Sequence, residues 1–323
     1  MKDKKITVVG CGRWGSLITW YLDKLGFSVT LYGRATSANM QRFIFERKND
    51  LLELPESVLL STSYEALADA DIIIVSIASQ SLRGFMETIK PMGLQNKIFV
   101  LCMKGIEAET GDRLSEIAAA NTDTSNKIAV WLGPGHVQDF YAGIPNCMVI
   151  DSEDEDVKRA LVEAFSSDLI RFYYGNDMIG NEIGAAAKNV IGIAAGMLDG
   201  AGLSTLKGAL MSRGSREISR LIAAMGGSEL SAYGLCHLGD YEATVFSRYS
   251  HNRMFGEMFI RGEKYDELAE GYYTVEALIN LSRKYNVELP ICEALYKILY
   301  LSADPHAVLG GLFNRTIKEE LKS

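Results

Sequence analysis

The most constraining feature of this chain is a glycine-rich turn between a short apolar strand and a helix. The run Ile6–Val9 leads into Gly10-Cys11-Gly12-Arg13-Trp14-Gly15, and a helix-compatible stretch, Ser16–Leu25, follows. The first glycine permits a tight bend, the second lets backbone N–H groups approach a pyrophosphate, and the third allows close helix–strand packing. The positive end of the helix favours phosphate at the same place. The turn therefore predicts a dinucleotide site with cofactor-binding residues Gly10, Gly12, Arg13, Trp14 and Gly15.

Size and composition limit what else the chain can be. A length of 323 residues exceeds what one hydrophobic core usually organises, so two domains are expected. The net charge of −8, without a long basic run, argues against nucleic acid and anionic membranes as partners. The longest apolar run, Val190–Leu198, is too short to cross a bilayer. The N-terminus has no signal-peptide pattern, and the five cysteines are scattered, so we expect a reduced, cytoplasmic chain without a metal site.

Strand-like and helix-like patterns alternate through the first half. Val and Ile dominate the strand-like segments, and helical patterns separate several of them, which predicts an α/β fold with a doubly wound, mostly parallel Rossmann-type sheet. The predicted strands are Lys5–Val9, Ser28–Tyr32, Val58–Ser61, Asp71–Ile77, Lys97–Cys102, Ala129–Leu132, Asn146–Ile150 and Leu169–Tyr174. The helices predicted between them include Ser63–Ala70, Gln80–Lys90, Thr110–Ala120 and Glu153–Ser166.

From about Asn181 the strand pattern stops and helical patterns dominate. The predicted helices are Gly184–Leu198, Leu206–Ala224, Met254–Arg261, Thr274–Tyr285, Ile291–Leu301 and Ala307–Glu320. We therefore expect a dinucleotide-binding domain of residues 1–180 and an all-helical substrate and catalytic domain of residues 181–323. In such two-domain proteins the substrate usually binds between the domains.

The end of the second predicted strand bears on the choice of cofactor. An acidic residue that binds the 2′-hydroxyl of NAD is expected about 20 residues after the glycine turn. Here the strand ends Leu31-Tyr32-Gly33-Arg34 instead. A guanidinium suits the 2′-phosphate of NADP, and Arg47 and Lys48 would add positive charge. The alternative is that Arg34 is an ordinary solvated cation. NADP(H) is thus the predicted cofactor, with NAD(H) left open.

Two lysines stand where ligand chemistry is expected. Lys104 follows a predicted strand, and the turn Gly133-Pro134-Gly135-His136 follows the next one. Open α/β sheets bind ligands at these strand ends. Lys188 lies beside Asn189 in a helix rich in Ala, Ile and Gly. Burial would lower its pKa and let it act as a general acid or base, whereas the alternative is a lysine that extends from a packed helix to solvent.

Taken in order, the motifs resemble the NAD(P)-dependent sn-glycerol-3-phosphate dehydrogenases, particularly the bacterial form, nearly end to end. The matching segments are Gly10–Gly15, Tyr32-Gly33-Arg34, Ser79-Gln80, Lys104-Gly105-Ile106-Glu107, Gly133-Pro134, Ala187–Ile191, Arg213-Gly214, Leu238-Gly239-Asp240, Asn252-Arg253, Glu270-Gly271 and Leu289-Pro290. The resemblance implies interconversion of dihydroxyacetone phosphate and sn-glycerol 3-phosphate, which supplies the backbone of glycerophospholipids.

The resemblance also implies roles for individual residues. Lys188 would exchange a proton with the C2 oxygen of the substrate while hydride passes between C2 and the nicotinamide. Lys104 would contact substrate and cofactor and stabilise the C2 oxygen as charge develops. Asp240 and Thr244 would orient Lys188 and the substrate. The implied substrate-binding residues are Lys104, Gly133, Gly135, Ser250, His251 and Asn252, and the implied further cofactor contacts are Arg34, Lys104, His251 and Glu270.

Three departures from the family pattern fall near these residues. The family has an arginine where this chain has His251, and a neutral imidazole offers one donor and no permanent charge. Arg248 and Arg253 are candidates to compensate. Gly135 replaces a Ser or Thr, and the loop 202–205 is short and lacks an asparagine. If His251 binds phosphate, substrate affinity should fall as the pH rises through the pKa of its imidazole.

Two other classes of protein remain open at this point. One is a related reductase of the ketopantoate reductase or opine dehydrogenase type, which does not explain the Lys104 and Asp240 motifs together. The other is a non-catalytic NADP-binding protein, which the retained Lys104, Lys188 and Asp240 argue against. The predicted partner is a small phosphorylated three-carbon substrate, and a homodimer is left open.

Overall fold

The computed structural model describes residues 1–314 and 320. Its first half forms one eight-stranded sheet. In chain order the strands are β1 Lys5–Val9, β2 Ser28–Tyr32, β3 Leu59–Ser61, β4 Ile72–Val75, β5 Ile98–Leu101, β6 Lys127–Leu132, β7 Asn146–Ser152 and β8 Ile170–Tyr174. They lie side by side in the order β3-β2-β1-β4-β5-β6-β7-β8, and every neighbouring pair is parallel except β6 and β7.

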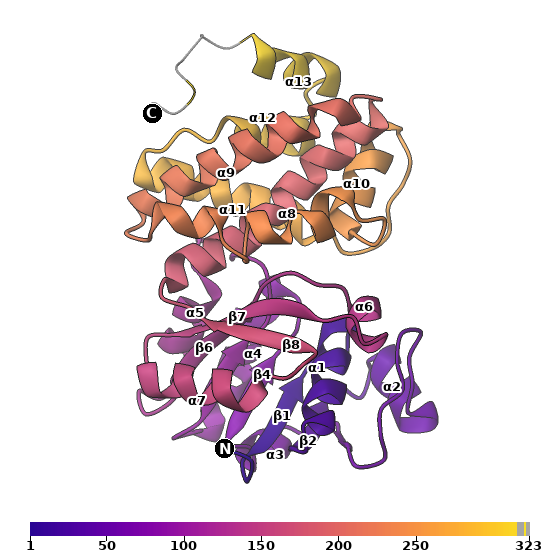
Figure 1. Ribbon diagram of the computed structural model, residues 1–323, viewed down its shortest axis with the longest axis vertical. Helices are drawn as coiled ribbons and strands as arrows, with labels where there is room; N and C mark the ends of the chain where they lie inside the picture. Colours follow the sequence, from indigo (N-terminus) through magenta and orange to yellow (C-terminus); the bar gives the residue numbers. More distant parts are fainter. Residues whose placement is uncertain (315–319, 321–323) are drawn as a thin grey trace.

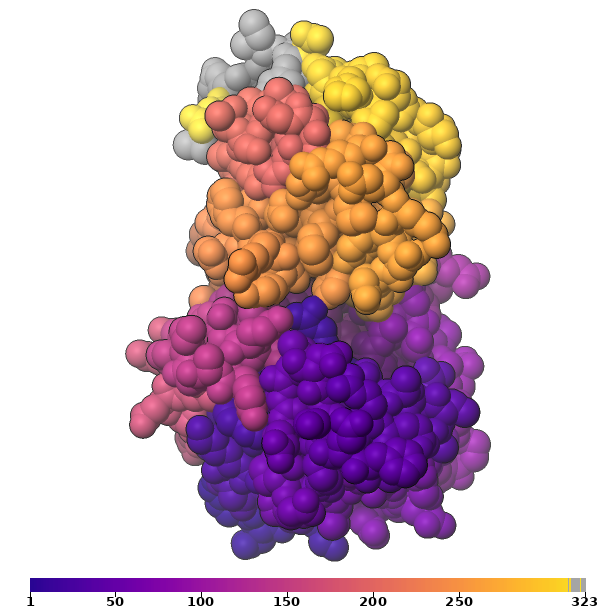
Figure 2. All heavy atoms as spheres, turned by 90° about the vertical axis from the view of Figure 1, so that its right-hand side faces the viewer, coloured from indigo at the N-terminus to yellow at the C-terminus, as the bar shows by residue number. Residues whose placement is uncertain are grey.

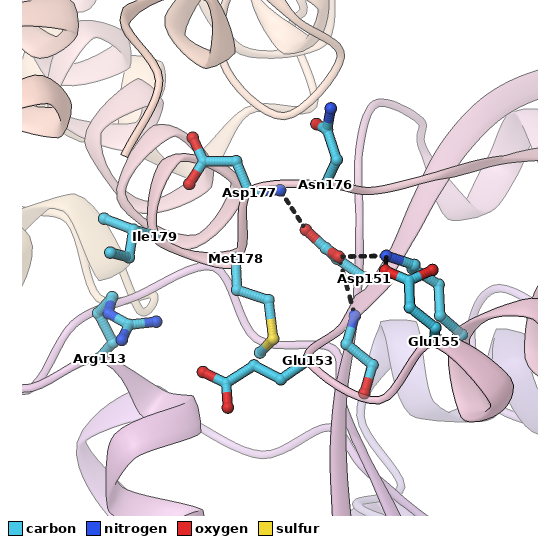
Figure 3. Close-up of a pocket in the computed structure, with 10 residues that line it drawn as sticks. Arg113, Asp151, Glu153, Glu155, Asn176, Asp177, Met178 and Ile179 are labelled. Carbon is cyan, nitrogen blue, oxygen red and sulfur yellow. Dashed lines mark hydrogen bonds and ion pairs between the residues drawn. The ribbon is translucent and has the colours of Figure 1, made fainter. Parts of the chain in front are cut away.

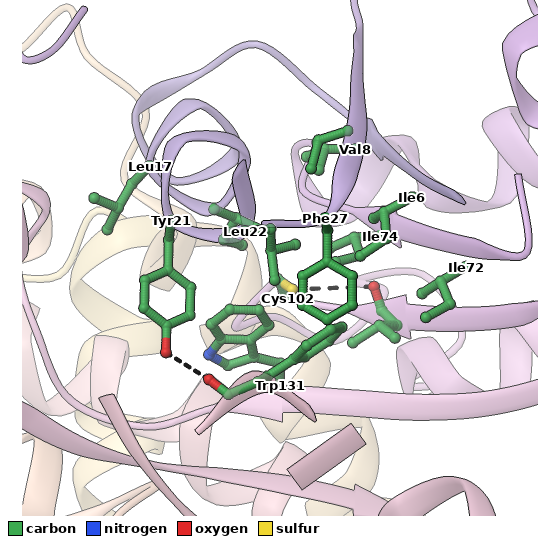
Figure 4. Close-up of a cluster of buried hydrophobic side chains, with 14 of the residues drawn as sticks. Ile6, Val8, Leu17, Tyr21, Leu22, Phe27, Ile72, Ile74, Cys102 and Trp131 are labelled. Carbon is green, nitrogen blue, oxygen red and sulfur yellow. Dashed lines mark hydrogen bonds between the residues drawn. The ribbon is translucent and has the colours of Figure 1, made fainter. Parts of the chain in front are cut away.

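Helices cover both faces of this sheet, which explains its continuous Val and Ile runs. Strand β4 shows the arrangement, because its side chains alternate between two cores. Ile72 and Ile74 pack with α1 and α7, and Ile73 and Val75 pack with α4 and α5. Figure 4 shows the first of these cores, in which the rings of Trp131 and Tyr21 pack with 6.1 Å between their centroids. The helices here are α1 Arg13–Lys24, α2 Ala38–Glu46, α3 Glu65–Ala68, α4 Leu82–Ile89, α5 Leu114–Ala120, α6 Val137–Tyr141 and α7 Glu155–Phe165, with 3-10 segments η1 Ser79–Ser81 and η2 Lys90–Met92.

The second half of the described chain is helical. Its central element is the long helix α8, which is buried almost throughout residues 182–198 and carries apolar or small residues on nearly every side. The helices are α8 Met178–Gly200, α9 Lys207–Ala224, α10 His251–Ile260, α11 Glu270–Tyr285, α12 Pro290–Tyr300 and α13 Pro305–Phe313. Short 3-10 segments η3 Ser204–Leu206, η4 Glu229–Tyr233 and η5 Leu238–Asp240, and the π-helical turn η6 Glu242–Phe246, connect them.

Glycines allow α8 and α10 to approach each other closely. A Cβ atom at Gly196 would overlap the backbone carbonyl of Arg253, and one at Gly256 would overlap the carbonyl of Ile193. The two backbones are therefore in direct contact. This contact fixes the start of α10 against the middle of α8, where Lys188 lies.

The helical half lies beyond one end of the sheet strands (Figure 1). In the space-filling view, indigo atoms of the N-terminal segment lie against the underside of the orange segment, where the two halves meet (Figure 2). Helix α8 also contacts strands β6 and β7, so it runs from the sheet into the helical half. Within the described part of the chain, no helix is both long and apolar enough to cross a membrane.

The predicted fold class is confirmed, and each of the eight predicted strands corresponds to a strand of the sheet. Helices α2 and α6 were not predicted. Both are short, and α2 buries only Met40 and Phe43, so neither has a long apolar stripe. The helix predicted over Ala307–Glu320 is present as α13 up to Phe313, and residues 315–319 lie outside the described residues.

Candidate active site

The glycine turn has the geometry that a dinucleotide requires. Gly10 has φ +110°, and a Cβ at Gly15 would overlap the carbonyl of Gly10, so the turn and helix α1 are packed tightly. Gly12 is different, because nothing lies within 4 Å of the position that its Cβ would take. No side chain caps the start of α1. Its first N–H groups therefore remain available to a phosphate, which fits a bound pyrophosphate.

Arg34 lies next to this turn. It is exposed just after β2, and β2 pairs with β1, which ends at the turn. A Cβ at the preceding Gly33 would meet Cys11 Sγ, so the two loops are in contact. The expected help from Arg47 is not supported, because its guanidinium instead donates to the carbonyls of Pro55 and Val58.

The carboxyl ends of β5 and β6 bring Lys104 to Gly133. These strands are parallel neighbours, so the loops that follow them meet at one edge of the sheet. Lys104 Nζ donates to the carbonyl of Gly133 at 2.5 Å and lies 2.7 Å from Asp240 Oδ2. Because Asp240 belongs to the helical half, the lysine joins the two halves of the molecule.

Lys188 meets the same carboxylate from the other side. Its Nζ lies 2.9 Å from Asp240 Oδ2 and donates to Thr244 Oγ1 at 2.8 Å. One carboxylate oxygen is thus shared by two ammonium groups, and the other oxygen, Oδ1, is buried without a partner in the described structure. The structure brings together four predicted residues, Lys104, Lys188, Asp240 and Thr244.

Burial tunes the proton affinity of this cluster. The side chain of Lys188 is only 9% exposed. Desolvation lowers its pKa to about 8, Asp240 opposes that change, and the nearby Lys104 adds to it. An ammonium with this pKa donates and recovers a proton readily near neutral pH. The alternative of a lysine that extends to solvent is wrong.

Amide side chains hold the helices around the cluster. Asn189 donates from Nδ2 to the carbonyl of Lys104 at 2.9 Å, and its Oδ1 accepts from Asn252 Nδ2 at 3.0 Å. Asn252 Oδ1 accepts in turn from the backbone N–H of Gly271. The hydroxyl of Ser250 caps α10 by accepting from the N–H of Arg253. The predicted residues Ser250 and Asn252 therefore lie beside the cluster and have structural partners there.

Glu270 lies at the start of α11 and reaches the sheet. Its Oε1 accepts from the backbone N–H of Ser79, which follows β4, at 3.1 Å. Its Oε2 and the hydroxyl of Ser79 are buried without a partner in the described structure. Burial raises the pKa of Glu270. Unpartnered acceptors and donors at this edge fit a polar ligand, as expected of a cofactor contact.

The structure explains Gly135. This residue has φ +137°, and a Cβ there would overlap the ring of Phe140, which packs on Trp14 with 5.9 Å between ring centroids. The family's hydroxyl-bearing residue has no room at this position. The ring of Phe140, from α6, fills the space that a side chain at Gly135 would need.

Arg13 and His251 form a further contact between the two halves. Arg13 is the first residue of α1 and His251 the first of α10, and Arg13 Nη1 lies 2.5 Å from His251 Nε2. The other ring nitrogen of His251 lies 2.5 Å from the hydroxyl of Tyr265. Both residues were predicted to bind ligands, but nothing in the sequence indicated that they touch.

The sequence patterns did not identify Asn189 and His136 as residues of the site. Asn189 stands next to the predicted lysine but drew no role of its own. His136 follows the Gly133–Gly135 turn, its Nε2 is buried without a partner in the described structure, and burial and Lys188 lower its pKa. The signal that was present is the position of His136 directly after a strand-end turn.

A cavity of about 320 Å³ lies elsewhere. Figure 3 shows it near the start of α8, lined by residues such as Asp151, Asp177 and Met178, none of which belongs to the predicted site. The carboxylate of Asp151 accepts from the N–H of Asp177 and from Asn181, and burial raises its pKa. These contacts tie strand β7 to helix α8, a structural role.

A doubly wound sheet with a glycine turn, joined to helices that place a buried lysine and a carboxylate at the sheet edge, defines a two-part dinucleotide-dependent oxidoreductase. Comparisons with known proteins agree. Residues 5–158 match the family model of the N-terminus of NAD-dependent glycerol-3-phosphate dehydrogenase, and residues 177–310 match that of its C-terminus. The chain therefore belongs to the family of NAD-dependent glycerol-3-phosphate dehydrogenases.

Individual relatives cover nearly the whole chain. The NAD(P)+-dependent glycerol-3-phosphate dehydrogenase of Chlorobium limicola is 33% identical over 98% of this chain and 99% of its own length. A counterpart from Salinibacter ruber is 34% identical over 98% of this chain and 96% of its length. The crystal structure of glycerol-3-phosphate dehydrogenase from Coxiella burnetii superposes with a TM-score of 0.90 at 26% identity, covering 98% of this chain and 100% of that one.

Proposed function

We propose that this protein interconverts dihydroxyacetone phosphate and sn-glycerol 3-phosphate with a nicotinamide cofactor, with Lys188 as the general acid and base. The observation that carries the proposal is the carboxylate oxygen of Asp240, which is shared by Lys104 and Lys188 at 2.7 and 2.9 Å. This cluster joins the sheet edge to the helices, and family membership supports the substrate. We place the domain boundary near residue 180, between β8 and the body of α8.

The cofactor site uses the glycine turn, Arg34 and Glu270. The free N–H groups at the start of α1 would hold the pyrophosphate, and the exposed Arg34 supports a preference for NADP(H) over NAD(H). When bound, the nicotinamide supplies the hydride for reduction of the ketone and accepts it in the reverse direction.

Lys188 moves the proton. In the reductive direction its ammonium donates a proton to the C2 oxygen as that oxygen gains negative charge, and in the oxidative direction the neutral amine removes the hydroxyl proton. A pKa of about 8 suits both tasks near neutral pH, because neither form of the amine is rare there. Thr244 directs the nitrogen by accepting one of its hydrogen bonds.

Lys104 and Asp240 prepare the electrostatics of the site. The Lys104 ammonium stays fixed by Gly133 and Asp240, so it stabilises the developing oxyanion without reorganisation. The negative charge of Asp240 offsets the repulsion between the two ammonium groups. We expect Ser250 and Asn252 to hold the start of α10 in position beside the substrate. A role in glycerophospholipid synthesis and a cytoplasmic location remain predictions.

A substrate panel tests the proposal. NADPH oxidation would be followed by absorbance with dihydroxyacetone phosphate, with ketopantoate, and with pyruvate plus an amino acid. Turnover of the first substrate alone is expected. Turnover of ketopantoate or pyruvate instead would favour the related reductases, and no turnover with measurable NADPH binding would favour a non-catalytic protein.

The Lys188→Ala variant tests the role of the lysine. We expect turnover to fall by about 10²- to 10⁴-fold, the usual contribution of a general acid, with little change in the Kd of NADPH. Fluorescence titration of NADPH separates the two effects. Lys158→Ala is a matched control, because that lysine is equally buried but pairs with Glu155 on α7. Unchanged turnover in Lys188→Ala would remove this lysine from the mechanism.

A further inference from the structure

The contact between Arg13 and His251 has a defined polarity. A guanidinium has only donors, so His251 Nε2 accepts from Arg13 Nη1 with its lone pair. The ring proton is then on Nδ1, which donates to the hydroxyl of Tyr265. The imidazole is therefore neutral in this arrangement. Burial and the charge of Arg13 lower the pKa of His251, and Glu267 opposes this only in part.

The positive charge at this corner consequently belongs to Arg13. Its second hydrogen-bond partner, Gln138 Oε1 at 3.4 Å, is also neutral. Other arginines that are largely buried have carboxylates, as Arg113 has Glu182 at 2.7 Å and Arg253 has Asp199 at 2.8 Å. Among the described residues, no carboxylate lies within ion-pair distance of Arg13. A half-buried guanidinium with only neutral partners and free donors favours an anionic ligand.

The corner lies close to the proton-transfer cluster. His251 precedes Asn252, the side-chain amide of Asn252 donates to that of Asn189, and Asn189 directly follows Lys188 in α8. Arg248 and Arg253, which the sequence suggested as replacements for the family's arginine at position 251, are not available to bind a phosphate there. Arg253 is paired with Asp199 and Glu257, and Arg248 is exposed and stacks on Tyr249.

We propose that Arg13, supplied by the cofactor-binding turn, is the residue that binds the phosphate of the substrate, and that His251 is a positioning residue that aims it. This rests on the function proposed above. Two anionic groups would come near the turn, the phosphate of the substrate and the pyrophosphate of the cofactor. The turn offers the pyrophosphate its backbone N–H groups, whereas the guanidinium is held across the junction by α10. We therefore assign Arg13 to the substrate.

The test compares two substrates that differ only in the phosphate. The kcat/KM for dihydroxyacetone phosphate would be divided by that for dihydroxyacetone, in the wild type and in Arg13→Gln. We expect the ratio to fall by about 10- to 100-fold, the range for a lost charged hydrogen bond, while the value for dihydroxyacetone and the Kd of NADPH stay within about threefold. Arg248→Gln is the matched control and should leave the ratio unchanged.

The role of His251 has its own readout. His251→Phe removes the acceptor and should lower the same ratio, and His251→Gln, which restores a neutral acceptor, should recover most of it. A merely structural role would lower the rates for both substrates together. If Arg13→Gln is unstable, Arg13→Lys retains the charge without the planar fork and should still lose several-fold in the ratio.

Three results would overturn the inference. They are an unchanged ratio in Arg13→Gln, a loss of NADPH affinity that accounts for the whole effect, and a loss of the ratio in Arg248→Gln instead. All three leave the proposed function standing, since the wild type still reduces dihydroxyacetone phosphate. Failure of the wild type to reduce it would refute the proposed function and the inference together.

Discussion

Replacement of Asp240 by asparagine removes the negative charge that lies between two ammonium groups. The distances of 2.7 and 2.9 Å to the shared oxygen limit the separation of the two nitrogens to about 5.6 Å. At an effective dielectric constant of about 20, two unit charges at that distance repel by ~3 kcal/mol. Without the carboxylate this repulsion is no longer offset. A free energy of ~3 kcal/mol corresponds to about a hundredfold change in the protonation equilibrium of Lys188. Lys188 in Asp240→Asn should therefore be largely neutral at pH 7.

The two directions of the reaction should respond differently. Reduction of the ketone needs the ammonium form. A hundredfold shift from a pKa of about 8 leaves roughly a tenth of the lysine protonated at pH 7, so the reductive kcat should fall by about tenfold. Oxidation of the alcohol needs the neutral amine and should fall much less. The sign of the pH dependence follows from the lowered pKa. In the wild type the reductive rate declines as the pH rises through about 8, and in the variant that decline should begin at a lower pH.

The assay is kcat against pH in both directions, with the unfolding free energy measured alongside. Asp199→Asn is a suitable control, because Asp199 is also shared by two cations, Lys207 and Arg253. Both variants should lose stability, by as much as ~3–5 kcal/mol for a broken buried pair. Only Asp240→Asn should change the pH profile. Equal losses in both directions with an unchanged profile would refute the electrostatic reasoning and leave Asp240 a structural role.

Three further outcomes are expected. Glu217 accepts two N–H groups at the start of α12, and burial raises its pKa from 4.5 to about 7. Between these pH values the folded state binds more protons than the unfolded state, so ~3 kcal/mol of the unfolding free energy is lost as the pH rises. Glu217→Gln should abolish this pH dependence in urea unfolding. Gly256→Ala should lower the unfolding free energy by ~1–3 kcal/mol, because the added methyl group meets the carbonyl of Ile193. Gly208→Ala, with open space around the new methyl group, should be neutral or stabilising, and equal melting temperatures of the two variants would contradict this. Arg34→Ala should raise the KM for NADPH at least tenfold and leave that for NADH unchanged, and a parallel rise in both would point to NAD instead.

Local sequence patterns predicted much of the fold. Central strands such as β4 are short apolar runs buried on both faces, whereas the edge strands β3 and β8 are partly exposed, and all eight could still be located from the sequence. The glycine turn likewise predicted a phosphate-binding bend, whereas the apolar surroundings of Lys188 left open a buried amine or a lysine that extends to solvent. Short amphipathic pieces such as α2 escaped, because a helix that buries two side chains leaves almost no periodic signal.

The individual strands, the turn before α1 and the apolar helix that carries Lys188 could be predicted from the sequence, because each depends on residues within a few positions of one another. Which distant side chains share a partner depends on the tertiary structure. Lys104 reaches a carboxylate 136 residues away, and Arg13 meets an imidazole 238 residues away. These contacts depend on the direction in which each loop leaves its strand or helix, and packing between the two halves sets that direction. No local pattern of residues encodes it.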